Sequence, residues 1–208
     1  MKFNRWILIL LVIVGGLIYF SLPKQSQVPS KSSADSLQIA EKRAAKDVQF
    51  KTGDESPIPD KTNFKGLTYY PYDATWIIPF EITRSAKVTR ISLQMTDGSV
   101  DSLLVFGKAH ADLAGMHVDL IVYQHDSGDF FIPFKDKTAP TETYGGGRYL
   151  ELPLTKLKDN QLTIDFNEAF FPYCAYNKTF ACPIPPKENQ LNIRIPAGEK
   201  NLNPRGEP

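Results

Sequence analysis

The residues with the clearest potential for chemistry lie around a run of three glycines in the C-terminal third of the sequence. Tyr144 precedes glycines 145–147, and Arg148 follows them at the start of a strand-like run. Glycines in this arrangement can point successive backbone N–H groups into an anion-binding concavity, and the arginine can add a charged fork. A Walker loop or a dinucleotide fingerprint needs a helix after its glycines, whereas a strand is expected here. The alternative is a structural loop with unusual φ values, whose arginine pairs with Asp136 or Asp165.

A second stretch combines polar residues with the two cysteines of the chain. Asp165 and Asn167 end a strand-like run, and a proline-bounded aromatic loop with Cys174 and Cys182 follows. In an oxidising compartment the simplest interpretation is a disulfide, which would stabilise the fold by about 2–3 kcal/mol in the chain-entropy model. Free or redox-active thiols and a metal site remain alternatives. Zinc usually takes about four ligands, and the seven residues between these cysteines differ from the tight spacing of zinc motifs.

The three histidines lie apart from both stretches. His110 shares one strand face with Asp112, and His117 shares one with Asp119, which would suit acid–base chemistry. Histidine beside aspartate on an exposed strand is also common without function. Together with His125 these histidines could complete a metal site at the cysteines, but they belong to a hairpin elsewhere in the chain. The sequence therefore predicts no metal ion and no cofactor.

Composition indicates a folded domain without affinity for nucleic acid. The chain has 208 residues, a formal net charge of +1 and 12% aromatic residues. Disordered chains are poor in aromatic residues, and nucleic-acid-binding domains normally carry a basic stripe. The 16 prolines and 13 glycines favour a β-rich domain with many turns.

The N-terminal segment 6–22 predicts attachment to a membrane. It contains 17 residues without a charge, close to the minimum for a spanning helix, and Lys2 and Arg5 precede it. The positive-inside rule places the N-terminus in the cytoplasm and the following domain outside it, on a single-pass anchor in the inner membrane. A cleaved signal peptide is the alternative, but bulky residues end the apolar run. No cysteine stands there, which argues against a lipoprotein.

Four regions follow from this organisation: an anchor at 1–22, a polar linker and short helix at 23–46, a β-rich domain at 47–200 and a polar tail at 201–208. The spacing predicts a helix over Ser36–Val48, with Leu37, Ala40, Ala44 and Val48 as its apolar face.

Short β-rich runs separated by turn residues fill the remainder of the chain. The predicted strands are Trp76–Thr83, Lys87–Met95, Val100–Leu113 with a bend at Gly107, His117–Gln124, Asp129–Phe134, Arg148–Pro153, Leu162–Phe166 and Gln190–Ile195. About eight strands at this spacing predict a mainly β, single antiparallel barrel or sandwich-like domain.

The two stretches also resemble a known family. The strings PFKDKTAPTETYGGGRYLELP and DFNEAFFPYCAYNKTFACPIPPKENQLNIRIPAGEK, with FKTGDESPIPDKTNFKGLTYYPYD upstream, are similar to domain-of-unknown-function family 1684, in its short, envelope-associated bacterial form. The resemblance implies a compact β-rich fold without established activity. Its hallmark positions are Asp136, Thr138, Thr143, Tyr144, Gly145, Gly147, Arg148, Tyr149, Asp165, Asn167, Cys174, Cys182, Pro183, Pro185, Pro186 and Asn189. Phe171-Pro172 departs from the Asn-Pro pair that the family commonly has. The resemblance includes relatives that lack an export signal and still have both cysteines. This favours free thiols or a metal site over a disulfide that only stabilises the fold.

The leading functional hypothesis is a ligand-binding or interaction module of the cell envelope, whose partner is a small anionic ligand or an envelope protein. The expected ligand-binding residues are Tyr144, Gly145, Gly146, Gly147, Arg148, Asp165 and Asn167. One alternative is a hydrolase with Asp165 as general base and Arg148 stabilising an anion. Another is a thiol or metal protein that acts through Cys174 and Cys182.

Overall fold

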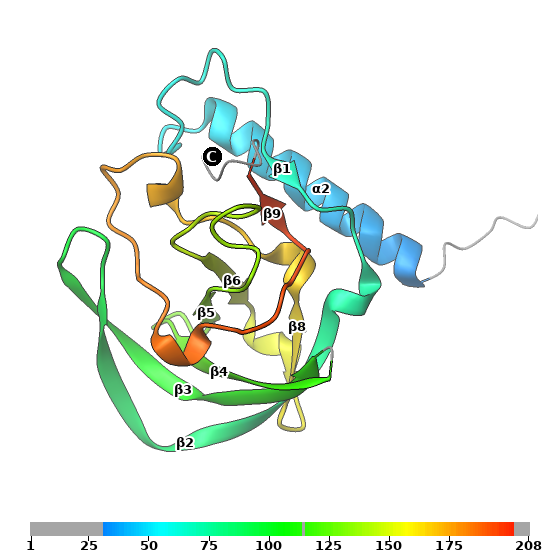
Figure 1. Ribbon diagram of the computed structural model, residues 1–208, viewed down its shortest axis with the longest axis vertical. Coiled ribbons are helices and arrows are strands. Elements are labelled where there is room, and N and C mark those ends of the chain that lie inside the picture. The colour runs from blue at the N-terminus through cyan, green and yellow to red at the C-terminus, as the bar shows by residue number, and fades with distance from the viewer. Residues whose placement is uncertain (1–30, 114, 202–208) are drawn as a thin grey trace, which may run out of the picture. The chain divides into compact units, whose positions relative to one another are not determined.

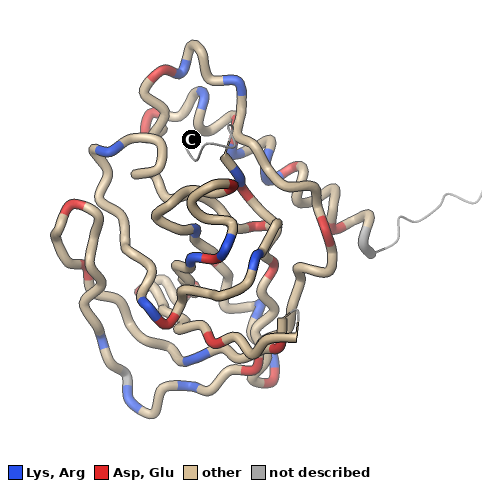
Figure 2. The backbone as a smooth tube through the Cα atoms, in the orientation of Figure 1, with Lys and Arg blue, Asp and Glu red and all other residues tan. Residues whose placement is uncertain are grey.

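The computed structural model describes residues 31–113 and 115–201 (Figure 1). The expected anchor at 6–22 and the expected tail from 202 onward lie outside these residues. Within the described chain, no helix combines the length and apolarity that a membrane crossing needs. From Asp35 onward the chain forms one compact unit. Figure 2 shows acidic and basic residues interspersed along it.

The helix α2 spans Lys31–Thr52, beyond both ends of the expected helix. It ends at Gly53, whose N–H donates to the carbonyl of Gln49 at 2.7 Å. A side chain at position 53 would meet that carbonyl oxygen at 2.6 Å, so glycine suits this end of the helix. Figure 1 shows α2 passing beside the short strands β1 and β9.

The expected apolar face of this helix is wrong. Leu37 and Val48 are 59% and 62% exposed, and Ala40 and Ala44 are also exposed. The helix packs instead through a face that includes Ile39, Arg43, Lys46, Asp47 and Phe50. Charged side chains can occupy this face because Arg43 and Lys46 find hydrogen-bonding partners on the β domain, and the backbone N–H of Leu67 donates to Asp47.

The β structure is an open antiparallel sheet of seven strands with a separate two-stranded sheet. The order in the large sheet is β6-β5-β4-β3-β2-β8-β7. Its strands are β2 Ile77–Gln94, β3 Val100–Leu113, β4 Met116–Gln124, β5 Phe130–Phe134, β6 Arg148–Leu152, β7 Leu157–Lys158 and β8 Gln161–Asp165. The small sheet pairs β1 Thr68–Tyr69 with β9 Glu199–Lys200. Among the described strands the edges β6 and β7 do not pair, so the barrel alternative is wrong.

Single-turn helices connect several of these strands. They are η1 Ala74–Trp76, η2 Leu154–Lys156, η3 Phe166–Glu168, η4 Tyr173–Ala175 and η5 Lys187–Asn189.

Three of the expected strands differ from the structure by more than one residue at an end. The runs Trp76–Thr83 and Lys87–Met95 form the single long strand β2, whose pairing with β3 is irregular between Arg84 and Thr89. The expected strand Gln190–Ile195 makes only an isolated bridge, through Gln190 to Lys135.

Two apolar clusters lie on opposite faces of the sheet. Phe130 and Ile132 of β5 belong to the main cluster, whereas Phe131 between them belongs to the second. This division follows from the alternation of side chains along a strand. Residues of the C-terminal segment 191–197 complete the main core, and both cysteines pack in the second cluster.

Candidate functional site

Arg148 is part of the protein interior and is not a free anion receptor. Its side chain is 1% exposed, and Nη2 donates to Asp136 Oδ1 at 3.1 Å and to the Ile195 carbonyl at 2.9 Å. Nη1 donates to the carbonyls of Ala197 and Glu199. Burial lowers the pKa of Arg148, and the charge of Asp136 opposes that shift. The guanidinium thus ties β6 to the C-terminal segment.

Asp136 completes this buried network. Its Oδ2 accepts from the backbone N–H of Ile195 at 2.6 Å, and its Oδ1 accepts from the Thr138 hydroxyl at 2.7 Å. The hydroxyls of Thr138 and Thr143 lie 2.7 Å apart. Segment 190–195 is therefore held by the side chains of Asp136 and Arg148 together with backbone hydrogen bonds. The N–H of Leu191 donates to the Lys135 carbonyl, and the N–H of Lys137 donates to the Ile193 carbonyl, both at 2.7 Å.

The glycine loop is shaped by close packing. Gly147 has φ +97°, and a Cβ there would lie 2.5 Å from the Phe134 carbonyl oxygen and 2.9 Å from Pro185. A Cβ on Gly146 would lie 2.4 Å from the ring of Tyr144. Residues without a side chain are therefore required by the protein itself at these positions. The structure therefore agrees with the alternative interpretation, in which the glycines form a structural loop and Arg148 pairs with Asp136.

Asp165 and Asn167 form a separate network at the end of β8. Asp165 caps η3, because its Oδ1 accepts from the backbone N–H of Asn167 at 2.9 Å and from its Nδ2 at 2.8 Å. Asn167 also exchanges hydrogen bonds with the backbone of Asp73. Burial raises the pKa of Asp165, and the hydrogen bonds from Asn167 oppose this. Within the described chain, the hydrogen bonds of Arg148 go to Asp136, Ile195, Ala197 and Glu199, so this network is separate from that of Arg148.

Tyr144 belongs to a third group, with the two cysteines. Cys174 and Cys182 are buried free thiols, and the N–H of Cys174 donates to Cys182 Sγ at 3.2 Å. Hydrogen bonding from the Cys182 thiol, aided by Tyr144 and Thr96, lowers the pKa of Cys174 to about 7 against the effect of burial. The same pairing raises the pKa of Cys182. Of the two cysteines, Cys182 lines a cavity of about 300 Å³, whereas Cys174, whose pKa is lowered, does not line it.

A cavity of about 240 Å³ beneath α2 brings together residues that the sequence reasoning missed. Lys42, Arg43 and Lys46 line it from the helix, and Asn167 and Glu168 line it from η3. Aromatic side chains complete the wall: Phe50, Tyr69, Phe170 and Tyr173. The sequence does contain a signal for this site. Lys42 and Lys46 are four residues apart with Arg43 between them, so they share one helix face, but the spacing of apolar residues predicts that this face is exposed to solvent.

The cations of this cavity differ in their partners. Lys42 Nζ lies 2.8 Å from Glu168, and Lys46 Nζ lies 2.9 Å from the buried Glu199. Arg43 donates to the carbonyls of Tyr70 at 3.0 Å and Asn167 at 3.2 Å. Within the described chain Arg43 thus makes no ion pair with a carboxylate. Burial lowers its pKa, and Tyr69, Asp165 and Glu199 oppose this.

A second cavity of about 480 Å³ lies on the other side of the Lys46–Glu199 ion pair. Glu199 and Lys200 of β9 line it, together with the loop that contains Phe64 and with Phe171. The expected site residues therefore separate into three networks. Only Asn167 among them lines either of these two cavities.

Comparisons with known proteins agree with the fold. A family model described as a protein of unknown function, DUF1684, matches residues 62–200. The solution structure of an uncharacterised protein from gene locus rrnAC0354 of Haloarcula marismortui is similar, with 34% sequence identity and a TM-score of 0.66. The match covers 82% of this chain and 96% of that one. A comparison with curated proteins gave no match. The chain therefore belongs to the DUF1684 family of proteins of unknown function.

Proposed function

We propose that this chain is a binding module of the cell envelope that holds a small anionic ligand with an aromatic body in the cavity beneath α2. The observation that carries the proposal is the pairing of three cations on one wall with aromatic side chains around them. Such a pocket, mostly apolar with a few convergent polar groups, is the usual form of a small-molecule site.

The charges of the cavity favour an anion. Glu168 is the one acidic residue among those lining it, against Lys42, Arg43 and Lys46. Glu168 pairs with Lys42 and the buried Glu199 pairs with Lys46, so the excess positive charge is that of Arg43. Lys42 is 51% exposed, so its ion pair with Glu168 can be exchanged for a ligand carboxylate at little cost. Arg43 adds a charge that no carboxylate of the described chain pairs with at close range, and its planar fork suits a carboxylate or phosphate.

The size and lining of the cavity favour an aromatic body. The guanidinium of Arg43 lies 4.5 Å from the ring centre of Tyr69, and Lys46 Nζ lies 4.8 Å from that of Phe170. A volume of about 240 Å³ is small for a ligand site, which limits the ligand to one or two rings.

The test uses 2-naphthoate as the probe and 2-naphthalenemethanol as its neutral counterpart, with the full-length protein in detergent. Calorimetry is expected to show saturable binding of the anion, and Lys42→Gln to weaken it about tenfold, the equivalent of one charge-assisted hydrogen bond of about 1.5 kcal/mol. Lys51→Gln is the matched control, because Lys51 is an exposed lysine of α2 that does not line the cavity. Equal binding of both probes, or equal effects of both variants, would contradict the proposal.

Attachment to the inner membrane is a second part of the proposal. It rests on the uncharged segment 6–22 after Lys2 and Arg5, which would leave the β domain outside the cytoplasm. In that compartment Cys174 and Cys182 would close a disulfide. Alkaline phosphatase fused after Pro208 is expected to be active in cells, and the same fusion without residues 1–22 inactive. Activity of both fusions, or of neither, overturns this topology.

Thiol counting then tests the disulfide separately from the topology. Protein alkylated during extraction without reductant is expected to show no free thiol when full-length, and two when residues 1–22 are absent. Two free thiols in a chain whose fusion is active would refute the disulfide and leave the topology intact.

The hydrolase alternative has less support from the described residues. The carboxylate of Asp165 accepts two hydrogen bonds from Asn167, lines neither the cavity beneath α2 nor the second cavity, and lies in a network without Arg148.

A further inference from the structure

A pair of histidines and a pair of aspartates meet on the β3–β4 hairpin, outside the networks described above. In the register of the two strands, His110 lies opposite Asp119 and Asp112 lies opposite His117. Residues two apart on a strand share a face, so the four side chains form a block on one face of the sheet. The residues that alternate with the block along the two strands, Ala109, Leu113, Val118 and Leu120, belong to the main core. The block therefore lies on the outer face.

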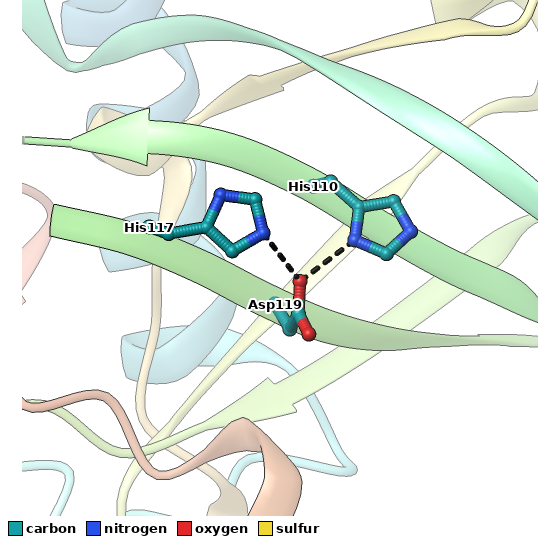
Figure 3. Close-up of side chains that lie close together, drawn as sticks. All are labelled: His110, His117 and Asp119. Atoms are coloured by element: carbon teal, nitrogen blue, oxygen red, sulfur yellow. Dashed lines mark hydrogen bonds and ion pairs between the residues drawn. The ribbon is translucent and has the colours of Figure 1, made fainter.

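Both histidines of the block converge on one carboxylate oxygen of Asp119. Figure 3 shows the rings of His110 and His117 turned toward Asp119. Asp119 Oδ1 lies 2.7 Å from His110 Nδ1 and 3.2 Å from His117 Nε2. The three ligand atoms all lie within 4.8 Å of one another. Ligand atoms around a tetrahedral metal ion are about 3.4 Å apart, so only small side-chain movements would admit an ion.

The outward nitrogens of both rings already have acceptors. His117 Nδ1 lies 3.2 Å from Asp112 Oδ1, and His110 Nε2 lies 3.2 Å from Thr83 Oγ1. In the metal-free protein the ring nitrogens that face Asp119 donate to its carboxylate. An arriving ion would displace those protons, and protons held on the outward nitrogens would then leave lone pairs directed at the ion. A carboxylate that fixes the tautomer of a ligating histidine is the usual second layer of a metal site. Histidine and aspartate that pair by chance on a surface need no such additional partners, so the contacts of Asp112 and Thr83 with the two rings favour a metal site.

We propose that His110, His117 and Asp119 bind a single transition-metal ion, with Zn²⁺ as the first candidate. Two imidazoles and a carboxylate suit zinc, nickel or copper, whereas calcium and magnesium prefer oxygen ligands alone. His117 and Asp119 are 65% and 41% exposed, so the bound ion would keep positions open for water or a small ligand.

The neighbouring charges allow the ion to bind. Asp112 and Asp119 contribute two negative charges, and Glu81 of β2 lies opposite His110 in the register. Lys108 lies 3.7 Å from Asp119 Oδ2, which leaves Oδ1 to the histidines. Lys108 is 46% exposed and can move away from an arriving cation.

The test is calorimetry of Zn²⁺ with full-length protein that carries no polyhistidine tag. One ion per chain is expected to bind, and His117→Asn or Asp119→Asn to weaken binding about tenfold or more. Asp112→Ala is expected to weaken it by a similar factor while leaving the three ligands in place. His125→Asn is the control, because His125 lies outside the block. The ring of His125 packs against Phe131 instead.

Co²⁺ provides a second readout that does not depend on the heat of binding. Bound Co²⁺ is expected to give the intense visible d–d bands of a four- or five-coordinate site in the wild type and to lose them in His117→Asn, whose exposed position should leave the fold intact. Absence of saturable Zn²⁺ binding would overturn the proposal. So would Zn²⁺ binding that survives the His117 and Asp119 substitutions, or that responds equally to His125→Asn.

Discussion

Replacing Asp136 with alanine is expected to lower the free energy of unfolding by about 3–5 kcal/mol, because it leaves the guanidinium of Arg148 buried without its countercharge. Both side chains of this ion pair are 1% exposed, so water cannot replace the lost carboxylate. The backbone N–H of Ile195 and the hydroxyl of Thr138 would lose their acceptor as well. Chemical denaturation of the full-length protein, followed by circular dichroism, measures the change.

The matched control is Asp126→Ala. Asp126 pairs with Arg90 on the surface, where the two side chains are 78% and 47% exposed, and such pairs contribute at most about 1 kcal/mol. Equal losses of unfolding free energy in the two variants would show that the buried network contributes no more to stability than a surface ion pair does. Arg148→Ala is expected to destabilise the protein by a similar mechanism, since it leaves Asp136 buried and unpaired.

Replacing Lys46 with methionine is expected to cost about 3 kcal/mol at neutral pH, because the buried carboxylate of Glu199 loses its ion-pair partner. Lys46 is 21% exposed, which places the cost at the lower end of the range for buried pairs. Methionine keeps the length of the side chain over Phe50 and Phe170, so the loss reports mainly on charge.

The pH dependence of this loss has a definite sign. Burial raises the pKa of Glu199 above its ordinary value of 4.5, and the charge of Lys46 opposes that shift. A carboxyl with a raised pKa contributes stability that is complete below its ordinary pKa and is lost as the pH rises through its folded value. Removing Lys46 raises that pKa further. The cost of Lys46→Met is therefore expected to shrink as the pH falls from neutral toward 4.5.

Two further variants separate charge from packing. Adding Glu199→Gln to Lys46→Met is expected to restore most of the stability at neutral pH, since no buried charge then remains. Lys51→Met on the same helix is exposed and should change the free energy of unfolding by less than about 0.5 kcal/mol. A pH-independent loss in Lys46→Met, unaltered by Glu199→Gln, would contradict the account.

The sequence predicts the sheet well wherever local signals decide it. The strand Val100–Leu113 and its irregularity beside Gly107 are confirmed, because alternation and a missing side chain are local features. The single strand β2 is predicted as two strands, because Ser85 and Ala86 interrupt the apolar pattern, whereas the strand continues through a shift in its register with β3 between Arg84 and Thr89. Segment 190–195 reads as a strand, but its backbone partners include the side chains of Asp136 and Arg148, which are distant in sequence.

The candidate site is predicted less well, for a physical reason that α2 illustrates. Apolar spacing places Leu37 and Val48 inside, yet the cations Arg43 and Lys46 face the domain because Asn167 and Glu199 supply their partners. These partners are more than 120 residues away along the chain. Arg148 shows the converse. Its residue type suggests ligand binding, but only the tertiary structure reveals that four groups of the protein already use it.

The hydrogen bonds of Arg148 also bear on how the domain is made in the cell. Its acceptors on Ile195, Ala197 and Glu199 are near the C-terminal end of the described chain and are synthesised some fifty positions after the arginine itself. The nascent chain therefore leaves the ribosome with its central cation lacking these partners and its main core lacking segment 191–197. Native folding is completed only after translation has passed β9, and a chain that stops before it retains an exposed core for proteases to cut.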